Sequence, residues 1–386
     1  MNADELKDTI SFFDDKDLEI NEIGSKAFRL AEVMNCGISV PKWFSVKRSA
    51  FAQLIDQIDA DLRGLWENLD ASSKSEINDL SSKITAKIFR LGAPCLDRKA
   101  IEKCFDGFFG PNDLVAVRSS ATDEDSKKNS FAGQLDSFLC IARNDLFENI
   151  LKVFSSAYSP RILAYRKANG LASPQGTSVL VQKMVSSVAS GVMFTVDPVL
   201  RDFSKSIIVS GFGLGEGIVQ GIVETDTFNF DRDSKFVSGT VVKKEKQVAL
   251  LGSGTALVKV AAEKAQLSTL NDEQVKTLFE IGLKLEHSFL QPQDVEWAVD
   301  GSGQIFITQS RPITTVDSGS ARYFDCSNIS EGYPGVSTPL TYSFTKQYYQ
   351  DIFTQTLLDF GISNTFIRAE RNCLENLISA LDGKIY

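Results

Sequence analysis

The sequence is poor in residue types on which several catalytic classes depend. Its 386 residues include one histidine, His287. A histidine-rich metal site is therefore excluded, and a Ser-His-Asp triad has a single candidate base. The six cysteines form no Cys-x-x-Cys pair, which argues against a zinc site or a disulfide framework. His287 itself falls in a helix predicted from residue 272 to about 289, where a solvated surface position is the favoured interpretation.

Long apolar runs and an excess of basic residues are also missing. No stretch approaches the roughly 18 apolar residues of a membrane span, and the N-terminus is acidic rather than basic and apolar. The net charge of -9 argues against nucleic acid or an anionic membrane as a partner, because both bind basic surfaces. We therefore expect a cytoplasmic protein with reduced thiols.

Two familiar phosphate-binding fingerprints are absent as well. Residues 206–217 read as a buried strand followed by four alternating glycines. They match neither G-x-G-x-x-G nor G-x-x-x-x-G-K, although such glycines still permit close approach of the backbone. Any nucleotide site must therefore be indicated by other residues.

Residues 293–312 predict a hairpin, because two β-prone runs flank a short connection that contains glycine. Pairing Val299 with Gln304 would set Asp294 opposite Gln309. A bulge of one residue would change this register.

Side-chain alternation on this hairpin gathers Asp294, Glu296, Gln309 and Arg311 on one face. The other face, with Trp297 at its centre, is expected to be buried. Carboxylate and amide oxygens beside a guanidinium suit a Mg²⁺ ion shared with phosphate oxygens. The alternative is an amphipathic hairpin whose charged face is simply solvated.

Two cations stand at places where phosphate could bind. A helix predicted over residues 24–34, with Ser25 as N-cap and Gly37 just beyond its end, puts Lys26 in the first turn. Arg118 ends a short buried strand and precedes a polar, small-residue loop. Each cation could hold an anion, but a surface lysine and an acidic surface loop explain the same residues.

Several further elements follow from periodicity and turn residues. Residues 177–185 and 190–198 are expected to pair as strands, with the backbone of residues 182–184 able to bind an adenine edge and Met184 either core or packed on the ring. The remaining predictions are helices over most of residues 49–109, broken near 91–94; helices over 144–158 and 160–168; a hairpin over 227–242; a linker at 314–321; and an amphipathic helix from about residue 341.

In their order and spacing, eight stretches resemble the nucleotide-binding domain of the phosphoenolpyruvate synthase and pyruvate phosphate dikinase family, which includes rifamycin phosphotransferases. The stretches are residues 24–27, 117–126, 130–134, 182–185, 190–198, 213–217, 294–297 and 309–312. The resemblance implies an α+β, ATP-grasp-like fold in which two lobes close on MgATP. Residues 1–185 would form the N-terminal lobe, 186–315 the C-terminal lobe, and 316–386 a linker and the start of an acceptor-substrate domain, truncated in this chain.

Carried over by position, the resemblance also implies roles for individual residues. Three cations would hold the triphosphate, three side chains would bind Mg²⁺, and one strand end would hold adenine beside a glycine-containing loop. The triphosphate would be held by Lys26, Arg118 and Arg311, and Mg²⁺ by Glu296, Gln309 and Asp294. The strand end comprises Gln182, Lys183 and Met184, and the glycine of the loop is Gly133. One departure is Ser25, where many relatives have glycine.

The activity implied is a dikinase that splits ATP to AMP and passes the β-phosphate through a phosphohistidine. That histidine belongs to a swivelling domain with a Thr-Ser-His context, which this sequence lacks. The acceptor would be pyruvate or, alternatively, an antibiotic of the rifamycin type. A nucleotide-binding module without catalysis and an ATP-grasp ligase that forms an acyl-phosphate remain open alternatives.

Overall fold

The computed structural model describes residues 9–13, 15, 17–70, 73–122, 135–232, 234–252, 254–314, 329, 332–333, 335–369, 378, 380–381 and 384–385. They belong to two compact units, Met1–Val316 and Asp317–Tyr386. Gly133 and nearly all of the predicted linker at 314–321 lie outside the described residues.

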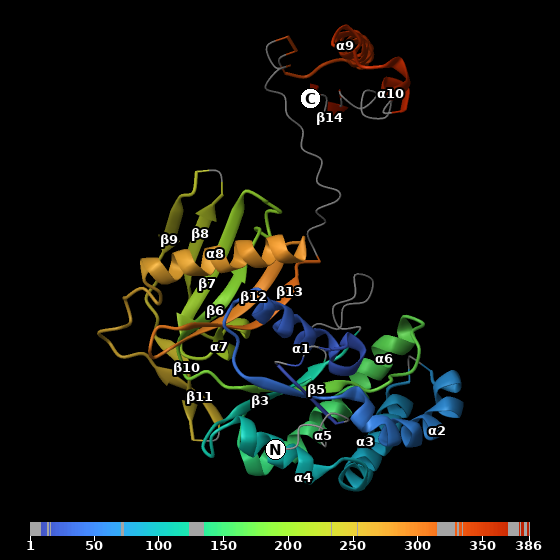
Figure 1. Ribbon diagram of the computed structural model, residues 1–386, viewed down its shortest axis with the longest axis vertical. Helices are drawn as coiled ribbons and strands as arrows, with labels where there is room; N and C mark the ends of the chain where they lie inside the picture. The colour runs from blue at the N-terminus through green and yellow to red at the C-terminus, as the bar shows by residue number, and fades with distance from the viewer. Residues whose placement is uncertain are drawn as a thin grey trace. The chain divides into compact units, whose positions relative to one another are not determined.

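The first lobe is built on a five-stranded antiparallel sheet with the strand order β1-β2-β5-β3-β4. Its strands are β1 Ile10–Phe12, β2 Trp43–Val46, β3 Val115–Ser120, β4 Ser137–Ile141 and β5 Ser178–Lys183. The helices of this lobe are α2 Ala52–Asn68, α3 Lys74–Cys95, α4 Arg98–Phe108, α5 Leu146–Ser156 and α6 Pro160–Ala168. Their apolar side chains and those of β1–β3 and β5 form one large core, so one face of the sheet is fully covered (Figure 1).

The second lobe is a six-stranded antiparallel sheet with the order β13-β12-β6-β7-β8-β9. Its strands are β6 Ser187–Phe194, β7 Lys205–Phe212, β8 Asp226–Asp231, β9 Val237–Thr240, β12 Gln293–Asp300 and β13 Ile305–Pro312. Helix α8, Asp272–Phe289, lies across this sheet (Figure 1). A short helix α7, Glu216–Val219, and a hairpin of β10 Lys246–Leu251 and β11 Gly254–Lys259 complete the lobe. The predicted α+β class and the two-lobed arrangement are confirmed.

Helix α1, Ile20–Asn35, belongs to the cores of both lobes. Leu30 packs with residues of β2 and β5, whereas Val33 packs with the core beneath α8. Gly24 interrupts the helix with φ 75°, and a Cβ at this position would come within 1.6 Å of the Ser120 carbonyl oxygen. Only glycine therefore allows the start of α1 to approach β3 so closely.

The prediction that Ser25 caps this helix is wrong. Its hydroxyl donates to the Ala121 carbonyl at 2.9 Å. The Ala27 N–H, in the first turn after the kink at Gly24, donates to the hydroxyl of Ser120 at 3.2 Å. This contact comes from a distant strand, which sequence spacing cannot reveal. The end of the helix is as predicted, with Gly37 in the left-handed region at φ 73°.

Two other predictions are corrected. Residues 177–185 and 190–198 do not pair, because β5 is sandwiched between β2 and β3 while β6 pairs with β7 and β12. The chain passes from one lobe to the other between β5 and β6, and each strand takes partners from distant segments. Helix α3 also continues through the expected break and includes Pro94, ending at Cys95.

The helix predicted from residue 272 is confirmed as α8, which begins with a capping box formed by Asn271 and Gln274. The predicted hairpin at 227–242 is confirmed as β8 and β9. In the described parts of the chain, no helix combines the length and the apolar character needed to cross a membrane.

The second unit contains α9 Pro339–Asp359, α10 Asn364–Ala369, β14 Ala380–Leu381 and β15 Lys384–Ile385. Thr338 caps α9 by accepting from the N–H of Thr341 at 3.2 Å. Thr345 is buried, and the half-buried Tyr342 and Tyr349 on the same side of α9 pack against the core residues Ile329, Ile378 and Ile385. The helix predicted from about residue 341 is therefore present, and its burial is one-sided.

Candidate functional site

A cavity of about 480 Å³ lies between the two sheets of the first unit. One wall is formed by β3, β4 and the end of β5, and the other by β6, β12 and the segment around α7. Five of the predicted site residues line it: Arg118, Gln182, Lys183, Met184 and Glu296. A cavity of this size is within the range of sites that bury a small organic ligand.

The predicted hairpin forms, but its register differs from the expected one. Val299 pairs with Ile305 rather than Gln304, and Asp294 pairs with Arg311 rather than Gln309. The turn is one residue longer than assumed, and a bulge after Glu296 adds one more residue on β13.

Cross-strand partners share a face, so the new register still gathers the four polar side chains. Glu296 pairs with Gln309, and Asp294 with Arg311. The opposite face is buried as predicted, with Trp297 1% exposed.

Arg118 connects the two lobes at this cavity. Its guanidinium donates to Gln309 Oε1 at 2.6 Å and to the Thr308 carbonyl at 3.4 Å, both on β13. It also donates to Gln182 Oε1 at 3.3 Å, and it lies 3.8 Å from Glu296 Oε2. One planar cation therefore meets four oxygen acceptors from both sheets, at a place where phosphate could take over several of these bonds.

The end of β5 forms the other end of this cavity. The Lys183 ammonium lies 2.7 Å from Asp113 Oδ2. The Met184 N–H donates to the Leu114 carbonyl at 2.9 Å. Because this N–H is already bonded, adenine would have to bind the Met184 backbone by donating a hydrogen bond to a carbonyl oxygen.

Lys26 lies next to β3 but is not part of the cavity lining. Its ammonium donates to the Ser119 carbonyl at 3.0 Å and lies 3.4 Å from the Ser119 hydroxyl. Ser119 is the penultimate residue of β3, and most of the loop that follows, residues 121–134, lies outside the described residues. The predicted contact between Lys26 and phosphate therefore stays a prediction.

Asp294 and Arg311 form an ion pair, with Nε and NH2 of the guanidinium 2.9 and 2.8 Å from Asp294 Oδ2. The other oxygen, Oδ1, is buried without a hydrogen-bond partner among the described residues. Burial raises the pKa of the Asp294 carboxyl above its ordinary value. The Arg311 guanidinium lowers this pKa, and the nearby Glu296 carboxylate adds to the rise. Desolvation outweighs the ion pair.

Asp294→Asn should therefore stabilise the unliganded protein at neutral pH. A raised folded-state pKa favours the fold when the carboxyl is protonated, and that stability is lost as pH rises through the folded-state pKa. Urea unfolding of wild type and variant across acidic to neutral pH tests this. The advantage of the variant should shrink as the pH falls toward the ordinary carboxyl pKa. An advantage independent of pH would show that the buried negative charge of Asp294 is not its cause.

The donor set on the hairpin fits Mg²⁺. Glu296 offers a carboxylate and Gln309 an amide oxygen, and Asp294 has a buried oxygen that lacks a donor. Within the described ranges, no three or more His, Cys, Asp or Glu side chains are grouped to hold a metal. A Mg²⁺ ion here would therefore need further oxygen ligands from phosphate or water, which is its usual habit.

Sequence reasoning missed Glu216, which lines the same cavity. Its Oε2 atom is buried and has no hydrogen-bond partner among the described residues. The available signal was the run of alternating glycines at 211–217, which encloses this single carboxylate.

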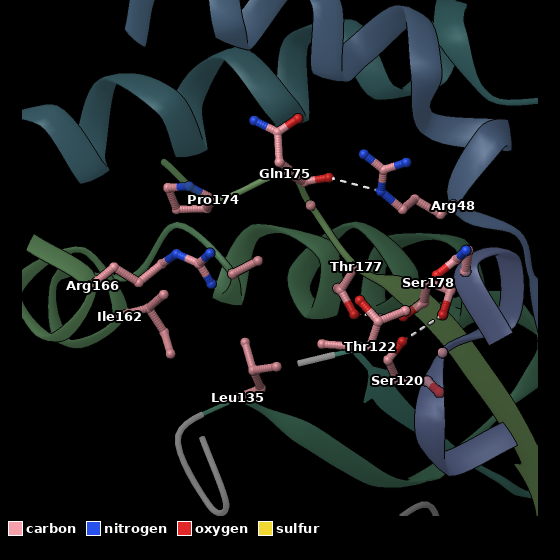
Figure 2. A pocket seen from close by; sticks show the side chains of 15 residues that line it. Arg48, Ser120, Thr122, Leu135, Ile162, Arg166, Pro174, Gln175, Thr177 and Ser178 are labelled. Atoms are coloured by element: carbon pink, nitrogen blue, oxygen red, sulfur yellow. Dashed lines mark hydrogen bonds between the residues drawn. The ribbon is translucent and has the colours of Figure 1, made fainter. Parts of the chain in front are cut away.

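A second, smaller cavity of about 190 Å³ lies at the far ends of β3 and β5 (Figure 2). Arg166 reaches toward it from one side, while the Nε of Arg48 donates to the Gln175 carbonyl at 3.2 Å. Ser178 donates to the Ser120 carbonyl at 2.6 Å and so closes the strand ends. None of the predicted site residues lines the described part of this cavity.

Two α+β lobes with a cavity between them, whose largely apolar lining includes cations and carboxylates, are typical of a small-molecule binding domain. The family model described as pyruvate phosphate dikinase, AMP/ATP-binding domain, matches residues 20–325. The chain belongs to this family, as the resemblance predicted.

Named relatives agree with this assignment. A probable phosphoenolpyruvate synthase from Archaeoglobus fulgidus is 35% identical over 306 residues, which cover 77% of this chain and 40% of the relative. A rifampicin phosphotransferase from Bacillus subtilis is 35% identical over 310 residues, which cover 77% of this chain and 35% of the relative. The chain thus spans less than half the length of either relative.

Solved structures with some likeness include the VanG D-Ala:D-Ser ligase from Enterococcus faecalis. Its TM-score is 0.31 at 11% identity, over 75% of this chain and 52% of the ligase. The D-alanyl-alanine synthetase A from Vibrio cholerae has a TM-score of 0.31 at 9% identity, over 78% of this chain and 57% of the synthetase. Likenesses of this size carry no conclusion about function.

Proposed function

We propose that this chain binds MgATP in the 480 Å³ cavity and serves as the nucleotide-binding part of a dikinase-type phosphotransferase. The observation that carries the proposal is the position of Arg118, whose guanidinium meets Gln309 and Glu296 of the opposite lobe. Membership of an AMP/ATP-binding family supports the same ligand.

In this proposal, Arg118, Arg311 and Lys26 hold the triphosphate, and Glu296, Gln309 and Asp294 bind Mg²⁺. Adenine lies at the end of β5, near Met184. Phosphoryl transfer requires alignment and neutralisation of charge more than covalent help from the protein. The cations would keep the phosphate chain in place, and Mg²⁺ would supply further charge neutralisation when bound.

The full reaction that we propose yields AMP, sends the β-phosphate through a phosphohistidine to an acceptor and passes the γ-phosphate to water or to inorganic phosphate. That histidine would belong to a swivelling domain, and the acceptor would bind to a domain that begins after the linker. Pyruvate is the first candidate acceptor. A rifamycin-type antibiotic is the second, because a rifampicin phosphotransferase is as similar to this chain as a phosphoenolpyruvate synthase is.

Calorimetry with and without Mg²⁺ tests the nucleotide site. Glu296→Ala is expected to weaken MgATP binding by at least about tenfold, because a hydrogen bond or metal contact to a charged group is worth more than about 1.4 kcal/mol. Without Mg²⁺ the same variant should bind ATP no worse than wild type, since one negative charge is gone. Arg311→Ala should weaken binding under both conditions.

The matched control is Glu280→Ala on α8, an exposed carboxylate that lies 3.8 Å from the Lys276 ammonium. This variant should bind ATP like wild type, both with and without Mg²⁺. Wild-type MgATP affinity in either Glu296→Ala or Arg311→Ala would show that the hairpin does not bind the metal-chelated nucleotide.

Turnover separates the dikinase from its alternatives. The chain would be incubated with ATP and a histidine domain produced separately from a relative. Phosphohistidine and AMP are expected. ADP formation with a carboxylate acceptor would instead indicate a ligase, and binding without any product would indicate a nucleotide-binding module.

A further inference from the structure

Among the carboxylates that line the 480 Å³ cavity, Glu216 has an oxygen that is buried without a hydrogen-bond partner in the described part of the chain. Its Oε1 accepts from Gln220 Nε2 at 3.3 Å. Its Oε2 is buried and has no partner among the described residues. A buried carboxylate oxygen without a donor is costly, and native proteins rarely retain one without a reason. Since Glu216 borders the cavity, a ligand that donates hydrogen bonds would remove this cost.

The segment that carries Glu216 is held in place by several specific contacts. The hydroxyls of Ser187 and Ser190 donate to the Gly213 carbonyl at 3.0 and 2.7 Å. The Leu214 N–H donates to the Val248 carbonyl at 2.8 Å. Gly213 has φ +79°, and a Cβ there would lie 2.2 Å from the Val248 carbonyl oxygen. These contacts fix the start of α7, and with it the position from which Glu216 extends.

Strand register places Glu216 between the proposed adenine end of the cavity, at the end of β5, and the proposed phosphate end, at Glu296 on β12. A Cβ on Gly215, its neighbour in sequence, would lie 3.8 Å from the Ser190 side chain. Ser190 pairs with Ala298 on β12, two residues from Glu296. The proposed phosphate end is therefore roughly 7 Å further along β12, at about 3.3 Å per residue.

The opposite wall gives a second indication of position. Burial raises the pKa of the Cys140 thiol on β4 to about 11, and the negative charge of Glu216 contributes to this rise. Glu216 therefore lies near β4 of the first lobe. Residue 141, the next along β4, is paired with Val115, which in turn pairs with Lys183 at the proposed adenine end.

We propose that Glu216 accepts hydrogen bonds from the vicinal ribose hydroxyls of the bound nucleotide and makes the site selective for ribonucleotides. This inference rests on the proposed binding of MgATP. A carboxylate repels phosphate but accepts well from hydroxyl groups, and an acidic side chain on the ribose hydroxyls is a recurrent solution in nucleotide sites. A position between the base end and the phosphate end is where the sugar must lie.

Calorimetry with ATP, 2′-deoxy-ATP and 3′-deoxy-ATP in the presence of Mg²⁺ tests the proposal. Wild type should bind ATP about tenfold more tightly than either deoxy analogue, as expected for a hydrogen bond to a charged acceptor. In Glu216→Ala the ratio of affinities should fall to about one, mainly through weaker ATP binding. Glu216→Gln, which keeps a neutral acceptor, should give an intermediate ratio.

A purely structural role for Glu216 would weaken all three nucleotides equally and leave the ratio as in wild type, which would overturn the proposal. Equal binding of the three nucleotides by wild type would overturn it too, while leaving MgATP binding intact. Failure of wild type to bind any of them would overturn the proposed function as well. Glu280→Ala again serves as the control that should keep the wild-type ratio.

Discussion

Asp226→Ala is expected to lower the free energy of unfolding of the first unit by about 3–5 kcal/mol, the range for breaking a buried ion pair from one side. Asp226 and Lys244 are both 0% exposed, and the ammonium lies 2.5 Å from Asp226 Oδ1. The carboxylate also accepts from the N–H and hydroxyl of Thr269, both at 2.9 Å, and from the Val242 N–H at 3.0 Å. Its removal would leave a buried cation and three further donors without their acceptor.

Urea unfolding followed by the fluorescence of Trp297, in the same sheet, would measure this loss. Lys244→Met should cost less than Asp226→Ala, because the carboxylate keeps its other donors. The control is Glu245→Ala, which removes an exposed ion pair with Lys243 and should cost less than about 1 kcal/mol. If Asp226→Ala costs no more than this control, the buried pair does not stabilise the second lobe.

Local patterns predicted the elements of the hairpin but not their register. Alternation of polar and apolar residues was enough to assign β12 and β13 and to separate the buried face of Trp297 from the polar face of Glu296. Register depends on turn length and on a bulge, and no residue type in residues 300–308 requires either. The four polar side chains still share one face, because cross-strand partners point to the same side of the hairpin in the predicted and in the observed register.

Long-range contacts were beyond local sequence reasoning. The Ala27 N–H of α1 donates to the hydroxyl of Ser120, 93 residues away in the chain. The bond between Arg118 and Gln309 spans 191 residues. Only the ordered set of motifs suggested that these segments meet, and that suggestion came from the family resemblance. The expected pairing of residues 177–185 with 190–198 failed because β5 pairs with the distant β2 and β3, whereas β6 pairs with the next strand, β7, and with the distant β12.

The burial of individual atoms could not be predicted from the sequence. Glu216 and Asp294 each have one oxygen that is buried without a donor among the described residues, which is a property of packing and not of spacing. The Glu216 oxygen lies in the cavity wall and the Asp294 oxygen on the β12–β13 hairpin. A ligand bound there could supply the missing hydrogen-bond donor or cation. The unliganded site therefore carries an electrostatic cost that ligand binding can relieve.

Arg118→Ala is expected to have the largest effect on nucleotide binding, raising the dissociation constant of MgATP by a factor of at least about 30. This corresponds to the roughly 2 kcal/mol or more that is lost when one member of a buried, hydrogen-bonded charge pair is truncated. The guanidinium donates both to Gln182 of the first lobe and to Gln309 of the second. Its loss would remove both the proposed phosphate contact and a link between the lobes.

Two further variants, measured by calorimetry with MgATP, separate the loss of the phosphate contact from the loss of the link between the lobes. Arg118→Lys keeps the charge but not the planar fork, so it should recover part of the affinity while failing to join Gln182 and Gln309 at once. Arg98→Ala, which removes a half-exposed arginine paired with Glu102 on α4, should bind MgATP like wild type. Small-angle scattering would detect any opening of the lobes in Arg118→Ala. If Arg118→Ala binds MgATP as tightly as Arg98→Ala, the triphosphate does not lie against β3 and the cavity between the lobes serves another ligand.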